Sequence, residues 1–243
     1  MILRVLRAER IKYRRAPVWL AVVILPLFPA VLGTANYLAN LEVLQQQWYS
    51  LWTQHTLFAS YFFLPALLAV FCAWQWRLEY AQHNFNSLLA APVSHWAVYL
   101  SKLLPAVGMS FLAQLVTGLL FLAGGAAAGI DAPVPPQLAE WLLCGGLGGM
   151  AVCAVQLFLS LLLPSFAIPV AIALVGGIAG LMVTAQGLGL WFPYSLLSLG
   201  MRANDPTMEL NVAVLLLSSV GYTCLFALLT VLLLKKRDSG GEP

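Results

Sequence analysis

The chain has 243 residues, of which 61% are hydrophobic and only 9% are charged, and its net charge is +3. A soluble domain carries about 25% charged residues, so this composition excludes a water-soluble protein and indicates a chain that lies largely in lipid. Its long apolar runs also lack the alternating polarity of a membrane barrel. We therefore predict an all-α integral membrane protein.

Six apolar runs are long enough to cross a bilayer, since each spanning helix needs roughly 20 residues. They predict a single transmembrane domain over residues 1–243, with spans at 17–38, 56–76, 103–125, 139–163, 167–189 and 211–234. Eleven of the twelve Lys and Arg residues fall on one side of this map, and only Arg202 falls on the other. The positive-inside rule then places both termini in the cytoplasm, so the positive charge indicates membrane topology and no binding of nucleic acid.

Residues 1–16 combine apolar positions with six basic side chains ahead of the first span. Val5, Leu6 and Tyr13 can share one side of a helix that is flanked by arginines, as in helices that lie on a membrane surface. We predict such an amphipathic surface helix here. The alternative is a plain basic flank that only sets the topology.

The segment between the first two spans carries apolar and aromatic residues at helical spacing. These residues are Leu41, Leu44, Trp48, Trp52 and His55. The spacing predicts a helix at the outer interface of the membrane, where Trp residues form an aromatic belt. Trp141 is expected in the same belt. The alternative function for this segment is to contact an amphipathic substrate at the outer surface.

The fourth and fifth spans contain pairs of glycines four residues apart, which predict close approach of neighbouring helices. The pairs are Gly145 with Gly149 and Gly176 with Gly180. After the fifth span the chain is moderately apolar and broken by prolines. This pattern predicts short helices on the outer side, before the sixth span begins.

Several functions are excluded by residue types that the spans lack. No ionisable residue falls at the middle of a predicted span, because Lys102 and Glu140 lie at helix ends and His55, His83 and His95 lie outside the spans. Ion-coupled transporters need such groups. We also find no catalytic set, no metal-ligand spacing, no cofactor motif and no phosphate-binding loop, so the chain is not expected to be an enzyme or to hydrolyse ATP.

Glutamines are the most polar residues inside the spans. Gln114 and Gln156 can form hydrogen bonds between helices, or they can line a translocation path. The sequence leaves both roles open.

The stretch 77–96, RLEYAQHNFNSLLAAPVSHW, is the only long polar interruption in the middle of the chain. Asn84 suits a cap or turn, and Pro92 ends a helix. Leu88 and Leu89 are apolar in a solvent-facing loop, which indicates a buried contact with a partner. The alternative is an ordinary interfacial helix between two spans.

This stretch resembles the loop after the second helix in type-2 ABC exporter permeases. The matching residues are Glu79, Asn84, Leu88, Leu89, Pro92 and Val93, followed by Lys102. The chain is most similar to lantibiotic-immunity permease subunits, which share its length, its six spans and an N-terminal Glu-x-x-Lys, here Glu9 and Lys12. It departs from the family at His83, where the family often has Gly.

The resemblance implies that this loop forms a coupling helix that docks on a cytoplasmic ATPase, which would bind ATP and Mg²⁺. It also implies a second permease chain, identical or paralogous, in a bacterial plasma membrane. The expected function is export of an amphipathic peptide antibiotic from the membrane. The alternatives are a lipid or polysaccharide exporter of the same superfamily, and a non-transporting sensor or scaffold.

Overall fold

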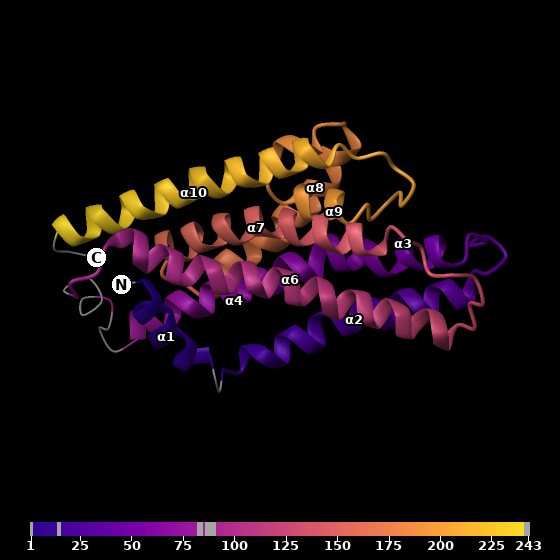
Figure 1. The fold of residues 1–243 in the computed structure, drawn as a ribbon, viewed down its shortest axis with the longest axis horizontal. Coiled ribbons are helices and arrows are strands. Elements are labelled where there is room, and N and C mark those ends of the chain that lie inside the picture. Colours follow the sequence, from indigo (N-terminus) through magenta and orange to yellow (C-terminus); the bar gives the residue numbers. More distant parts are fainter. Residues whose placement is uncertain (1, 14–15, 82–84, 86–90, 241–243) are drawn as a thin grey trace.

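The computed structural model describes residues 2–13, 16–81, 85 and 91–240, and all regular structure in this part of the chain is helical (Figure 1). The α-helices are α1 (Ile2–Tyr13), α2 (Val18–Ala39), α3 (Trp48–Phe58), α4 (Leu64–Tyr80), α6 (His95–Ala127), α7 (Leu138–Leu162), α8 (Ala167–Ala185), α9 (Ser195–Gly200) and α10 (Val212–Gly240). A π-helical segment, η1 (Ala59–Phe63), joins α3 to α4, and a short 3₁₀ helix, η3 (Gly189–Trp191), precedes α9.

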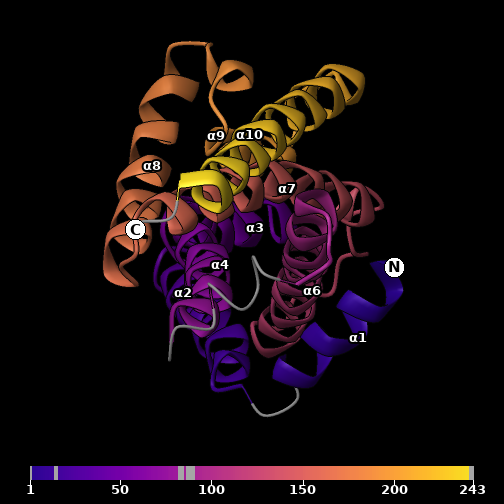
Figure 2. The ribbon, with the colours of Figure 1, turned by 90° about the vertical axis from the view of Figure 1, so that its left-hand side faces the viewer.

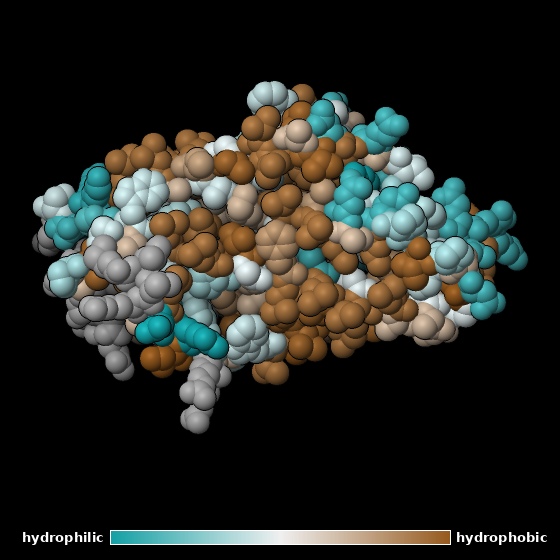
Figure 3. All heavy atoms as spheres, in the orientation of Figure 1, coloured by the Kyte–Doolittle hydropathy of each residue, from teal (hydrophilic) through white to brown (hydrophobic). Residues whose placement is uncertain are grey.

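Among the described residues, six helical segments are long and apolar enough to cross a membrane, which confirms the all-α class and gives six candidate spans. These segments are Val18–Ala39, Trp48–Tyr80, His95–Ala127, Leu138–Leu162, Ala167–Ala185 and Val212–Ser239. Figure 3 shows the corresponding pattern on one face of the molecule, where hydrophobic side chains cover the middle and hydrophilic ones gather at both ends. The orientation of the termini relative to a membrane stays a prediction.

The second span begins at Trp48, eight residues before its predicted start, because α3, η1 and α4 form one continuous helical segment. The predicted interfacial helix at Trp48–His55 is therefore the first part of a span, and the prediction that His55 lies outside the spans is wrong. Trp48, Trp52 and His55 are buried in the bundle. The two indoles can be buried because their N–H groups find partners inside the protein, in bonds to Ala132 O and Met201 O.

The centre of the bundle is formed by α4 and α7, and α2, α8 and α10 lie around it (Figure 2). Most side chains of α4 and α7 are buried, whereas α2, α8 and α10 expose many large apolar residues. In water such faces would be a liability, and in a bilayer they suit contact with lipid.

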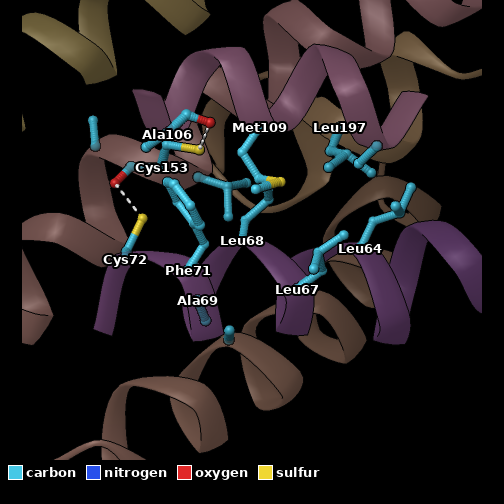
Figure 4. Packing of buried hydrophobic residues seen from close by; sticks show 14 of the residues in the cluster. Leu64, Leu67, Leu68, Ala69, Phe71, Cys72, Ala106, Met109, Cys153 and Leu197 are labelled. Carbon is cyan, nitrogen blue, oxygen red and sulfur yellow. Dashed lines mark hydrogen bonds between the residues drawn. The ribbon is translucent and has the colours of Figure 1, made fainter. Parts of the chain in front are cut away.

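The core between α4, α6 and α7 is built from interlocking apolar side chains (Figure 4). Leu68 and Phe71 of α4 pack with Met109 of α6 in this cluster. The thiols of Cys72 and Cys153 donate to backbone carbonyls at 3.7 and 3.3 Å. The four cysteines are unpaired, and the three buried ones act as small packing residues.

The short helix α9 packs directly on the backbone of α7. A Cβ atom at Gly148 would collide with the Leu196 carbonyl, and one at Gly200 would collide with the Cys144 carbonyl. Only glycine permits this approach. The predicted glycine pairs also lie at close contacts, since Gly176 meets the ring of Tyr194. Together, η3 and α9 provide short helices in the segment where the sequence predicts them.

The bundle has two ends that differ in the elements they bring together. The basic end contains α1, the C-terminal ends of α4 and α10, and the N-terminal end of α6 (Figure 1). The far end contains the α2–α3 and α6–α7 connections.

Candidate functional site: a buried charge cluster

Four charged side chains from three helices meet at the basic end, and we call them the charge cluster: Glu9, Lys12, Glu79 and Lys102. Glu9 and Lys12 lie three residues apart on α1, so one helical face presents both. Glu79 lies in the last turn of α4. Lys102 lies two turns inside α6, because that helix begins at His95 after the Ser94 side chain accepts a bond from Ala97 N.

Glu79 stands between the two lysines. Its Oε1 accepts bonds from Lys12 Nζ at 2.6 Å and from Lys102 Nζ at 2.7 Å. The Glu9 Oε1 atom lies 2.8 Å from Lys12 Nζ and 3.7 Å from Lys102 Nζ. Each cation therefore reaches both carboxylates, and the four charges sum to zero.

A polar and aromatic shell surrounds the cluster. The Tyr13 hydroxyl donates to Gln75 Oε1 at 2.9 Å, and Lys102 Nζ lies 4.8 Å from the centre of the Trp76 ring. Such a cation–π contact gains strength when the ammonium is desolvated. The Trp76 indole in turn donates to Leu157 O at 2.9 Å, so the shell reaches α7.

Burial decides what this cluster can do. Lys102 is fully buried, and Glu9 and Glu79 are 5% and 4% exposed. Charges at such sites need partners, because removal of one partner leaves an uncompensated buried charge. Burial alone would lower the pKa of Lys12, but the carboxylates of Glu79 and Glu9 outweigh it and raise that pKa. Burial, together with the Glu9 carboxylate, also raises the pKa of Tyr13, so Tyr13 stays a neutral donor.

The two ends of the stretch 77–96 are also tied to α10. Arg237 donates to the Tyr80 hydroxyl at 2.9 Å, and that hydroxyl donates to Leu161 O at 2.6 Å. His95 Nε2 lies 3.2 Å from Asp238 Oδ2. The described flanks of the stretch are thus bonded to α1 through the charge cluster and to α10 through Arg237 and Asp238.

The predicted coupling residues fall in two groups. Asn84, Leu88 and Leu89 lie outside the described residues, as does His83. Among the others, Glu79 is turned into the protein, Pro92 is exposed, and Val93 is half-buried against the core. Their contact with an ATPase stays a prediction.

The two glutamines proposed for a translocation path are not brought together. Gln114 approaches α7 at Gly145, and Gln156 lies eleven residues further along α7, about 16 Å away along its axis. Gln156 Nε2 donates to the Tyr194 hydroxyl at 2.7 Å. Within the described part of the chain, the Oε1 atoms of both glutamines are buried without a hydrogen-bond partner.

Sequence reasoning missed the depth of Lys102 and the partners of Glu79. The prediction that Lys102 lies at a helix end is wrong, since it lies inside the third span and is fully buried. The signal was available in part, because Glu9, Lys12, Glu79 and Lys102 all belong to the pattern quoted for the family resemblance. That pattern does not state that the four contact one another.

A second cluster that sequence reasoning missed lies at the far end. The rings of Trp48 and Trp52 pack edge-on against Phe121, and the centre of the Trp52 ring lies 4.9 Å from that of Phe121 and 5.1 Å from that of Trp141. All four rings are buried. The prediction that these tryptophans form an interfacial belt is therefore wrong, and they form part of the core.

The site holds helices together through charge interactions. In the described part of the chain, no group of three or more His, Cys, Asp or Glu side chains could hold a metal ion. The charge cluster joins helices that are far apart in sequence, and its ion pairs can exchange partners without exposing a charge.

Comparison with known protein families gives a match over most of the chain. The family model described as "ABC-2 family transporter protein" matches residues 5–180, which include all four members of the charge cluster. No curated protein and no solved structure matches the chain.

Proposed function

We propose that this chain, which belongs to the ABC-2 family of transporter proteins, is the permease of an ATP-driven exporter that takes force from its ATPase at residues 77–96. Members of this family are non-catalytic, multi-pass membrane subunits, and the family implies association with an ABC ATPase subunit. The export direction, the docking residues and the cargo are our proposals.

The charge cluster is the observation that carries the proposal. It bonds Glu79, near the start of the stretch 77–96, to Lys102, which follows the end of the stretch, and it bonds both to α1. A push on the stretch would therefore move α1, α4 and α6 together. Because a buried charge must keep a partner, the cluster would hold the three helices together even as its ion pairs exchange, and Glu79 acts in this proposal as a positioning residue. Leu88, Leu89 and the exposed Pro92 would supply the contact surface.

The proposed complex contains two permease chains, identical or paralogous, and two cytoplasmic ATPase subunits that bind ATP and Mg²⁺. The positive-inside pattern supports cytoplasmic termini, and the resemblance supports a bacterial plasma membrane. In this arrangement both termini and the coupling stretch would face the ATPases.

The cargo we propose is an amphipathic peptide antibiotic of the lantibiotic type. Buried amide oxygens at Gln114 and Gln156, without partners in the described part of the chain, support a polar lining that would become accessible when the helices separate. The apolar surroundings suit the other face of such a peptide. A lipid or polysaccharide cargo, or a sensing role without transport, are the competing functions.

The docking proposal is tested by replacing Leu88 and Leu89 with Asp in the chain purified with its ATPase. We expect loss of the complex and of ATPase stimulation, because buried apolar contacts would become charged. Leu41→Asp, at an exposed position of the far end, is the control and should leave both intact. A double variant that still assembles and stimulates fully would contradict the docking assignment.

The cargo proposal is tested in cells that carry the chain and its ATPase. We expect greater tolerance of a lantibiotic than in cells that lack either one, or that carry an ATPase unable to hydrolyse ATP. Equal tolerance in all these strains would exclude peptide export. A protective effect that persists without ATP hydrolysis would favour the sensing role.

A further inference from the structure

An apolar groove opens to the surface between α1, the start of α2, α4 and α6. Its volume is about 500 Å³, within the range of small-molecule sites. Phe71 and Met109 form the buried floor, while Trp19 and Gly108 lie at the exposed edge. Gly108 has no neighbouring atom within 4 Å of where a Cβ would lie, so this side of the groove is open.

One side chain in the lining is charged. Leu6, Arg10 and Tyr13 line the groove from α1, and their spacing of four and three residues puts them on one helical face. Glu9 and Lys12 point instead into the charge cluster. Arg10 is exposed and has no ion-pair partner among the described residues, so its charge is available to a ligand.

The groove also has the surroundings of a membrane boundary. The Trp19 indole donates to Tyr13 O at 2.7 Å while its ring stays 43% exposed. Trp residues with one bonded and one apolar side are typical of the interface between headgroups and acyl chains. The exposed Leu104 of α6 continues the apolar surface beside the groove. The apolar groove thus lies beside an interfacial tryptophan, and Arg10 is the one charged side chain in its lining.

We propose that this groove holds an acyl chain of an anionic phospholipid, whose phosphate pairs with Arg10. The apolar floor selects a hydrocarbon chain, and the arginine selects a negative headgroup, because guanidinium pairs with phosphate through two parallel bonds. A lipid seated here would contact α1, α2 and α6 at once and would hold α1 against the bundle. This inference does not depend on the nature of the exported cargo.

The test uses native mass spectrometry of the full chain released from dodecyl maltoside micelles that contain phosphatidylglycerol or phosphatidylcholine. Wild type should retain phosphatidylglycerol about fivefold more than phosphatidylcholine, as expected for one arginine acting on an anionic lipid. Arg10→Gln should abolish this preference. Gly108→Leu should abolish retention of both lipids, because its side chain enters the groove.

Two matched variants serve as controls. Arg7→Gln removes the same charge from the same helix outside the groove lining, and Gly221→Leu adds the same side chain at an equally open position on α10. Both should retain lipid as wild type does. Equal retention of the two lipids by wild type, or unchanged retention by Gly108→Leu, would overturn the proposal. So would displacement of phosphatidylglycerol by millimolar inorganic phosphate, which would reveal a site for the anion alone.

Discussion

The two ends of the bundle hold distant parts of the chain together by opposite means. At the basic end, α1, α4 and α6 meet through Glu9, Lys12, Glu79 and Lys102. At the far end, α3, α6 and α7 meet through edge-on and tilted aromatic rings, in which Trp48 and Trp52 contact Phe121 and Trp52 also contacts Trp141. Ion pairs can exchange partners as helices shift, whereas interlocked rings depend on one fixed shape. The end proposed to receive force is therefore adaptable, and the other end is a fixed anchor.

The largest effect should come from Lys102→Met, which keeps the length of the side chain and removes its charge. Lys102 is fully buried, so solvent cannot replace its charge beside the two carboxylates, and loss of one partner from a buried ion pair costs about 3–5 kcal/mol. Unfolding can be followed through maleimide labelling of Cys72, Cys144 and Cys153, which are buried, after Cys224 is replaced by Ser.

A double variant separates charge imbalance from general damage. Lys102→Met with Glu79→Gln leaves Glu9 and Lys12 as a balanced pair, so it should recover most of the lost stability. If the single variant costs under about 1 kcal/mol, the cluster does not behave as a buried ion network.

A smaller effect is expected from Trp52→Phe at the far end. The Trp52 indole donates to Met201 O at 2.9 Å, and the substitution leaves this buried carbonyl without its donor, at a cost of about 2 kcal/mol. The loss should be the same in low and high salt when measured by cysteine labelling. If the stability loss of Trp52→Phe changed with salt as much as that of the charge-cluster variants, the proposed difference between an electrostatic end and an aromatic end would be wrong.

The smallest effect should come from Lys12→Gln, because the Lys12 side chain is 33% exposed and solvent screens its pairs, which limits the loss to less than about 1 kcal/mol. Folding raises the pKa of Lys12 above its ordinary value of 10.5. Its stabilising effect is therefore complete below that pH and is lost as the pH rises through the folded-state pKa. The difference between wild type and variant should shrink in strongly alkaline buffer, and a difference that grows there would contradict the assignment.

Hydropathy and length predict the spans but not where two of them begin. The run Trp48–His55 contains hydroxyl, amide and imidazole groups, so its mean hydropathy falls although five of its eight residues are buried. Lys102 looks like a boundary residue because basic residues usually flank spans. Its depth depends on Glu79, which lies 23 positions away, and on Glu9 in another helix. Helical periodicity carries no information about such long-range pairs.

The resemblance to exporter permeases identified the residues of the charge cluster without their geometry. Glu79 and Lys102 belong to one loop pattern of the resemblance, and Glu9 and Lys12 form a separate N-terminal motif. The structure joins them in one network. The family itself could be predicted from sequence, since the match over residues 5–180 confirms a transporter of the ABC-2 family.

The π-helical segment Ala59–Phe63 connects the anchor at the far end to the charge cluster at the basic end. In a regular helix each residue advances the direction of its side chain by about 100°, so one residue more or fewer here would turn Trp52 by that angle relative to Glu79. Such a deletion would leave composition, charge and the six spans unaltered. The length of this five-residue segment therefore sets the rotation of Trp52 relative to Glu79 about the helix axis. Neither the aromatic rings nor the ion pairs could compensate for a change in that rotation.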